Sequence, residues 1–182
     1  MGGELDLAAY TTYLVQLAWL YAELESRTTV GEAFKSSESL WSPELLRGSS
    51  IDHDLRALGV TDWKSTTAPT PAMSHFCNHL AAIGDRSDLR LIAHHYTRYL
   101  GDLSGGQAIA RLVARHYNAT PDQLTFYSFE GIPEPVRFKE AYRSSLDSLQ
   151  LNDEQLAELV AEVQLAFTFN QNVFDDLNLT SK

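Results

Sequence analysis

The stretch HHYTRYLGDLSGGQ, residues 94–107, places an arginine, a carboxylate and three glycines in a segment with helical spacing of apolar residues. On a continuous helix Arg98, Asp102 and Gly105 share one face, at i, i+4 and i+7. An acid and a guanidinium beside bare main chain form a polar patch in an apolar setting. Ligand pockets are typically apolar with a few polar groups at defined positions, and this patch has the same character.

The glycines of this stretch need an explanation, because each mid-helix glycine costs about 0.5–1 kcal/mol relative to alanine. Four explanations are open. In the first, Gly101 ends a helix and Gly105-Gly106 forms a loop. In the second, the Gly101–Gly105 spacing allows a neighbouring helix to approach closely. In the third the glycines cradle a phosphate, and in the fourth the helix kinks so that its main chain lies against a flat ligand. A phosphate loop is the weakest, because no strand precedes it and no Gly-Lys-Ser/Thr follows. The neighbouring Arg98 and Asp102 favour the flat ligand.

The composition of the whole chain limits the class of protein. With 182 residues, 44% of them hydrophobic, we expect one domain spanning residues 1–182. A net charge of −10 argues against nucleic acid as a partner. The single cysteine, Cys77, fits a reducing cytoplasm. The sequence has no 18-residue apolar run and its N-terminus lacks a basic-then-apolar pattern, so we expect neither a membrane span nor an export signal. We expect a cytoplasmic monomer.

The elements that must position the patch are all predicted to be helical, because strand signals are missing. Capping residues, prolines and glycines set the expected boundaries. The predicted helices cover residues 5–27, 43–47 with Gly48 as the stop, 51–58, 71–83, the glycine-containing segment 88–117, a short turn from Pro121, 134–149 and 152–177. The predicted fold class is all-α.

Several longer motifs resemble one family. YTRYLGDLSGGQ, followed by an Ala-Arg-Leu helix, resembles the distal-helix motif of the heme oxygenases, which cleave heme to biliverdin, iron and carbon monoxide. Four further blocks match in the right order: LYAELE at 20–25, FYSFEGI at 126–132, RFKEAYRSSLDSL at 137–149 and AFTFNQNVFDDL at 166–177. The resemblance covers nearly the whole chain from about residue 5 onward and is greatest to bacterial members.

The resemblance implies roles for the distal residues. Gly101 and Gly105 would flank the heme face where O2 binds. Asp102 would be the distal acid, which orders water and does not bind iron, and Arg98 and Tyr21 would belong to its water network. From the residues alone, Asp102 fits a helix cap equally well, Arg98 fits a surface ion pair, and Tyr21 fits the core.

The resemblance also implies how the heme is held. Tyr96, Lys139 and Arg143 would meet the propionates, and Ser104 would contact the heme within the distal motif. Lys139 and Arg143 are spaced i, i+4, so they share one helical face, which suits a dicarboxylate ligand. From the residues alone, this pair is a solvated helix face.

The last predicted helix carries Phe167, Asn170 and Phe174 at i, i+3 and i+7. Periodicity alone places all three in the core, whereas the resemblance implies that this stretch, with Phe167 and Asn170, lines the heme pocket. For Phe174 we keep the core prediction.

The six histidines predict no metal site. His75 and His79 are spaced i, i+4, but no second pair or carboxylate partner is evident from the sequence. His94, His95 and His116 match no ligand role in the family, and His53 is expected to be exposed on a helix.

The chain departs from the family at its start. Heme oxygenases hold the iron through a proximal histidine on their first helix, whereas MGGELDLAAY resembles the loop after that helix, and no histidine precedes His53. A late start site, a truncation or a natural loss would each explain this. We expect the chain as written to bind heme weakly or in a nonproductive geometry.

The expected function is nevertheless that of a heme oxygenase. Its substrate and cofactor would be heme b, with O2 and an electron-donating reductase or ferredoxin as further partners. The alternative is a heme-binding or heme-transfer protein without turnover. Asp102 discriminates between the two, because a carrier gains nothing from a distal acid.

Overall fold

Every regular element in the computed structural model is helical over the residues that it describes, 6–34 and 37–180. The helices are α1 (Leu7–Thr28), α2 (Gly48–Ala57), α3 (Trp63–Thr66), α4 (Pro71–Ile83), α5 (Leu89–His95), the π-helical turn η3 (Tyr96–Leu100), α6 (Gly101–Tyr117), α7 (Pro135–Asp147) and α8 (Asp153–Thr180). Short 3₁₀ turns are η1 (Glu38–Leu40), η2 (Pro43–Leu45), η4 (Pro121–Gln123) and η5 (Thr125–Tyr127). The all-α prediction is confirmed.

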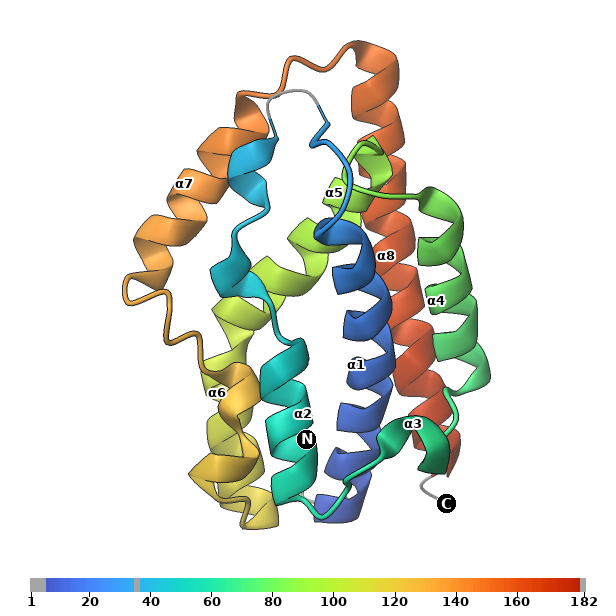
Figure 1. Ribbon diagram of the computed structural model, residues 1–182, viewed down its shortest axis with the longest axis vertical. Helices are drawn as coiled ribbons and strands as arrows, with labels where there is room; N and C mark the ends of the chain where they lie inside the picture. The colour runs from blue at the N-terminus through green and yellow to red at the C-terminus, as the bar shows by residue number, and fades with distance from the viewer. Residues whose placement is uncertain (1–5, 35–36, 181–182) are drawn as a thin grey trace.

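Helix α1 is the centre of the bundle. It packs against α2 on one side and α4 on the other, while α8 packs against α4 and α5 (Figure 1). Leu14, Tyr21 and Leu24 of α1 are fully buried, because α1 is covered on several sides. The chain from α5 through α6 crosses the bundle behind α1 and α2, and α7 lies at its outer edge (Figure 1).

Local capping explains where several helices begin. The Thr70 hydroxyl accepts a hydrogen bond from the Met73 amide at the start of α4. Before α8, Asn152 and Gln155 exchange reciprocal bonds between side chain and main chain, at 2.8 and 3.2 Å. Both boundaries were predicted from the sequence.

One predicted boundary is wrong, because Gly48 begins α2 instead of ending a helix. The Glu25 carboxylate of α1 accepts hydrogen bonds from the amides of Arg47 and Gly48, at 2.5 and 3.1 Å. This carboxylate satisfies the free amides at the start of α2 and suits the positive end of its dipole. A Cβ at Gly48 would lie 2.7 Å from a Glu25 oxygen, so the contact favours glycine.

The glycine-containing helix is interrupted before its glycines. A π-helical turn, η3, separates α5 from α6, and α6 then runs unbroken through Gly101, Gly105 and Gly106. The explanation in which Gly101 ends a helix and the next glycines form a loop is therefore wrong. A π turn inserts a residue into the helical register and is frequent at functional sites.

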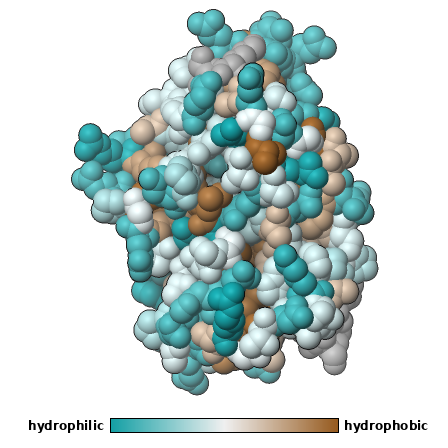
Figure 2. Space-filling model, viewed as in Figure 1, coloured by the Kyte–Doolittle hydropathy of each residue, from teal (hydrophilic) through white to brown (hydrophobic). Residues whose placement is uncertain are grey.

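The surface carries separate hydrophobic patches among polar side chains, on the face that Figure 2 shows. Among the described side chains of α7 and α8, the exposed large hydrophobic ones are Val136, Leu156, Val160, Phe167 and Phe174. Within the described residues, no helix combines the length and apolar character needed to cross a membrane.

Candidate active site

Four polar side chains meet on the inner side of the η3–α6 junction. Nη2 of Arg98 contacts both carboxylate oxygens of Asp102, at 3.1 and 3.2 Å. The Tyr21 hydroxyl of α1 donates a hydrogen bond to Oδ2 of the same carboxylate. Nη1 of Arg98 donates to Oδ1 of Asn170 on α8, at 2.9 Å. We call these four residues the distal network.

The fold fixes the distal network by packing. Arg98 precedes Asp102 by one helical turn across the η3–α6 junction, which brings guanidinium and carboxylate together. Tyr21 is fully buried, with its ring edge-on to Tyr99 and Phe126 at centroid distances of 5.5 and 5.7 Å. The family resemblance implied that Arg98 and Tyr21 belong to a water network around Asp102, and the structure joins the three residues by direct hydrogen bonds.

Burial sets the protonation of the network. It raises the pKa of Tyr21, and the Asp102 charge raises that pKa further. The phenol therefore stays protonated and donates a hydrogen bond to Asp102. Burial also raises the pKa of Asp102, which the Arg98 guanidinium and the Tyr21 hydrogen bond hold back. The Asp102 charge keeps Arg98 protonated despite its burial. Asp102 is thus an acceptor with two donors already in place.

One donor of the network is unsatisfied. Nε of Arg98 is buried and makes no hydrogen bond to any residue in the described part of the chain. Because buried polar groups are nearly always paired, this nitrogen is an exception to the general pattern.

The main chain beside the network is open. A Cβ built on Gly101 or Gly105 meets no heavy atom within 4 Å, whereas one on Gly106 would meet the Tyr127 ring at 3.2 Å. Close approach of another helix therefore does not explain the Gly101–Gly105 spacing. The open main chain is the surface that a flat ligand needs.

Aromatic side chains of α8 border this open side. Asn170 reaches Arg98, and Phe167 and Phe174 share its helical face, with exposed fractions of 62% and 45%. The Phe174 ring stacks on Tyr13 of α1 at 5.3 Å. The core prediction for Phe174 is wrong, because Tyr13 covers only part of its ring and 45% of the residue stays exposed. The exposure of Phe167 suits a pocket wall and not a core.

The residues predicted to meet the propionates and the nearby Ser104 come from three elements, η3, α6 and α7. Nζ of Lys139 on α7 donates to Oγ of Ser104 on α6 at 3.1 Å, so these two residues are brought together. Arg143 is exposed one turn farther along α7. Tyr96 is half-buried in η3, its ring 6.4 Å from that of Tyr142.

Sequence reasoning missed the contact by which Asn170 holds Arg98. The only signal was an amide at a position with core periodicity, which the structure explains as a partner for a buried guanidinium. The histidines have other partners. His53 bonds Asp122, His95 bonds Tyr142, and His79 and His94 both bond Glu162.

The sequence and the fold match known proteins. The sequence model of the heme oxygenase family matches residues 1–176. Heme oxygenase of Porphyra purpurea is 34% identical over 179 residues, which are 98% of this chain and 76% of that protein.

Solved structures agree. Heme oxygenase-1 of the cyanobacterium Synechocystis, in complex with heme, superposes with a TM-score of 0.89 at 26% identity, over 98% of this chain and 81% of that one. Heme oxygenase of Leptospira interrogans superposes with a TM-score of 0.88 at 32% identity, over 96% and 85%. The predicted resemblance is confirmed, and the chain belongs to the heme oxygenase family.

Proposed function

We propose that this chain holds heme b with one face against Gly101 and Gly105 and cleaves it oxidatively to biliverdin, iron and carbon monoxide. One observation carries the proposal: open main chain at two glycines lies directly beside the buried Asp102–Arg98–Tyr21 contacts. When bound, heme supplies both the iron that activates O2 and the porphyrin that is cleaved. The relatives' names and the heme complex of the Synechocystis protein support this assignment.

The residues around the open side fit a flat amphipathic ligand. Bare main chain at Gly101 and Gly105 admits a ring where any side chain would intrude. The exposed Phe167 ring offers apolar contact to the porphyrin, and Lys139 and Arg143 offer cations to its propionates. Tyr96 and Ser104 would add hydrogen bonds at the same edge.

The distal network would control protons. Asp102 accepts hydrogen bonds from Arg98 and Tyr21, which hold the carboxylate in one orientation. Held this way, Asp102 orders water molecules at the heme face and passes protons through them, while the strongly bound protons of Arg98 and Tyr21 stay in place. Proton delivery through water, in place of direct contact with an acid, favours attack of the activated oxygen on the porphyrin edge.

Electrons would arrive from a reductase or ferredoxin near the propionate edge, beside Lys139 and Arg143. The alternative, a heme-binding or heme-transfer protein without turnover, accounts less well for the site. Such a protein needs the open glycines but has no use for a buried carboxylate with a dedicated arginine and tyrosine.

Titration of the chain with hemin tests the proposal. With added imidazole as an axial ligand, we expect a sharp Soret band, and biliverdin after addition of reductant and O2; without imidazole we expect weaker binding and less biliverdin. Imidazole is included because His53, His79, His94 and His95 have other partners. Heme binding without biliverdin in both conditions would favour the carrier, and no heme binding would contradict the proposal.

A further inference from the structure

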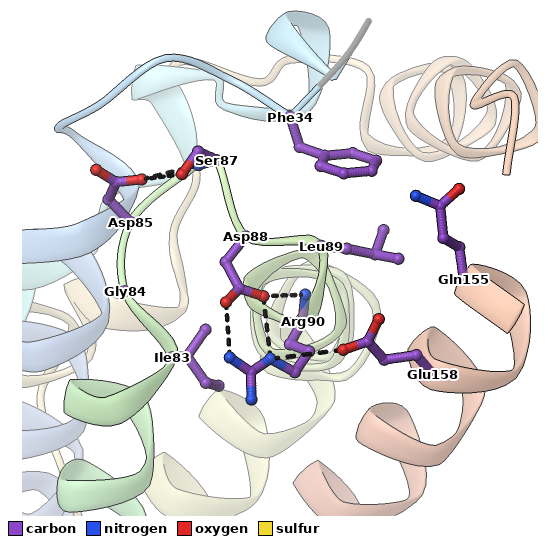
Figure 3. A pocket seen from close by; sticks show the side chains of 10 residues that line it. All are labelled: Phe34, Ile83, Gly84, Asp85, Ser87, Asp88, Leu89, Arg90, Gln155 and Glu158. Atoms are coloured by element: carbon purple, nitrogen blue, oxygen red, sulfur yellow. Dashed lines mark hydrogen bonds and ion pairs between the residues drawn. The ribbon is translucent and has the colours of Figure 1, made fainter.

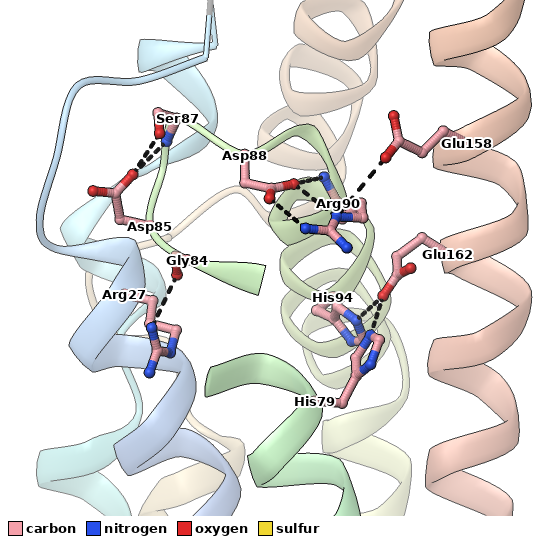
Figure 4. Close-up of polar contacts among 10 residues, drawn as sticks. All are labelled: Arg27, His79, Gly84, Asp85, Ser87, Asp88, Arg90, His94, Glu158 and Glu162. Carbon is pink, nitrogen blue, oxygen red and sulfur yellow. Dashed lines mark hydrogen bonds and ion pairs between the residues drawn. The ribbon is translucent and has the colours of Figure 1, made fainter. Parts of the chain in front are cut away.

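Two histidines and a glutamate from three helices meet outside the distal network. Nε2 of His79 on α4 and Nε2 of His94 on α5 lie 2.5 and 2.7 Å from Oε1 of Glu162 on α8. The three ligand atoms lie within 4.8 Å of one another, and Figure 4 shows them converging on one point. The prediction that His79 has no carboxylate partner is wrong, because Glu162 is 83 residues away in the sequence.

We propose that His79, His94 and Glu162 form a binding site for a divalent transition-metal cation of the zinc class. Two imidazole nitrogens and one carboxylate oxygen are a ligand set that zinc accepts, with a fourth position left for water. Magnesium and calcium are disfavoured, since they prefer oxygen ligands alone. This site is independent of the proposed heme chemistry.

Packing holds the three ligands in place before any metal arrives. The side chains of His94 and Glu162 are 0% and 9% exposed. The Phe169 ring lies 5.0 Å from the His79 ring, and the Phe76 ring lies 5.4 Å from the His94 ring. The metal therefore orders little on binding, which favours affinity. His79, with 24% of its side chain exposed, leaves an opening to solvent.

The protonation states suit metal binding. Burial alone would raise the pKa of Glu162, but the hydrogen bonds from His94 and His79 outweigh it and lower that pKa, so the carboxylate is ionised. Burial lowers the pKa of His94, so its ring is neutral. Neutral imidazole and ionised carboxylate are the forms that bind metal.

Coordination requires only a small rearrangement. Zinc bonds of about 2.0–2.2 Å set neighbouring ligand atoms roughly 3–3.5 Å apart, so each imidazole Nε2 must move away from Oε1 of Glu162 by up to about 1 Å. Each ring proton now shared with Glu162 moves to Nδ1 or is released. Nδ1 of His94 is buried and has no hydrogen-bond partner among the described residues. We therefore expect an affinity about 10–100-fold weaker than with a complete second shell.

A surface cavity of about 510 Å³ lies next to the cluster, between the start of α5 and α8 (Figure 3). Two of its lining residues, Arg90 and Glu158, precede His94 and Glu162 by one helical turn (Figure 4). Its charged lining residues are Asp85, Asp88, Arg90 and Glu158, three acids against one base. This excess of negative charge attracts cations toward the cluster.

Calorimetric titration of the untagged, chelator-treated chain with Zn²⁺ tests the site. We expect one tight Zn²⁺ per chain, at least tenfold weaker binding in His79→Ala, and unchanged binding in His75→Ala. His75 is the matched control, since it lies one turn earlier on α4, is exposed and is outside the cluster. Co²⁺ should give the strong visible absorption of a four-coordinate site in the wild type and in His75→Ala only.

A second measurement covers the buried ligand. Zn²⁺ should raise the Tm of the wild type, and Glu162→Gln should lose most of that rise. If Glu162→Gln does not fold, the His79→Ala comparison decides alone. The proposal is overturned if the wild type binds no Zn²⁺ tightly, or if His79→Ala and His75→Ala change the Zn²⁺ affinity equally.

Discussion

The Asn170 amide oxygen of α8 accepts a hydrogen bond from Nη1 of Arg98 at 2.9 Å. The amide nitrogen of Asn170 donates in turn to the Ala166 carbonyl one turn earlier in α8, at 2.7 Å, which fixes the orientation of the amide. Through this contact α8 positions the guanidinium that holds Asp102. Asn170 is thus a positioning residue for the distal acid.

Replacing Asn170 by Ala should lower the rate of biliverdin formation with little effect on heme affinity. A hydrogen bond to a charged group contributes about 1.5–3 kcal/mol, so the expected loss in rate is roughly 10–100-fold. Asn172→Ala, on an exposed position of α8, is the control. Equal rates in the two variants would remove Asn170 from the network.

Replacing Asp102 by Ala, or isosterically by Asn, should abolish most biliverdin formation, by at least about a hundredfold, because the proton path is lost. Heme affinity should stay nearly unchanged, and peroxidase-like oxidation of an added phenol should rise. Asp147→Asn, on the exposed side of α7, should behave as the wild type. Undiminished biliverdin in Asp102→Asn would refute the assigned role.

Asp54 tests the energetics of the fold. Its buried carboxylate on α2 accepts hydrogen bonds from the amides of Thr125 and Phe126, at 2.9 and 2.8 Å. Asp54→Ala leaves the buried Phe126 amide unpaired, so we expect the free energy of unfolding to fall by about 2–4 kcal/mol. Urea denaturation measures the free energy of unfolding. In the control variant His53→Ala, at the neighbouring exposed position, this free energy should fall by less than about 1 kcal/mol.

Features encoded by near neighbours could be predicted from the sequence. The caps at Thr70 and Asn152 need only residues three positions away, and Arg98 and Asp102 are one helical turn apart. The all-α class followed from such local patterns. The grouping of Tyr21 with Arg98 and Asp102 came from the family resemblance instead, since Tyr21 lies 81 residues from Asp102.

Features that depend on distant partners could not be predicted. Gly48 begins a helix because Glu25, 23 residues earlier, caps it from another element. The contact between Asn170 and Arg98 spans 72 residues. The exposure of Phe174 depends on which elements cover α8, and helical periodicity carries no information about that.

The most direct test of the account is the heme affinity of Gly105→Leu, measured together with its stability. A side chain at Gly105 points into open space, so the fold should gain about 0.5–1 kcal/mol from the better helix former. The same side chain would occupy the space of the heme, and we predict a loss of hemin affinity of at least tenfold. A variant that is equally or more stable and binds hemin as tightly as the wild type would contradict heme binding at this face.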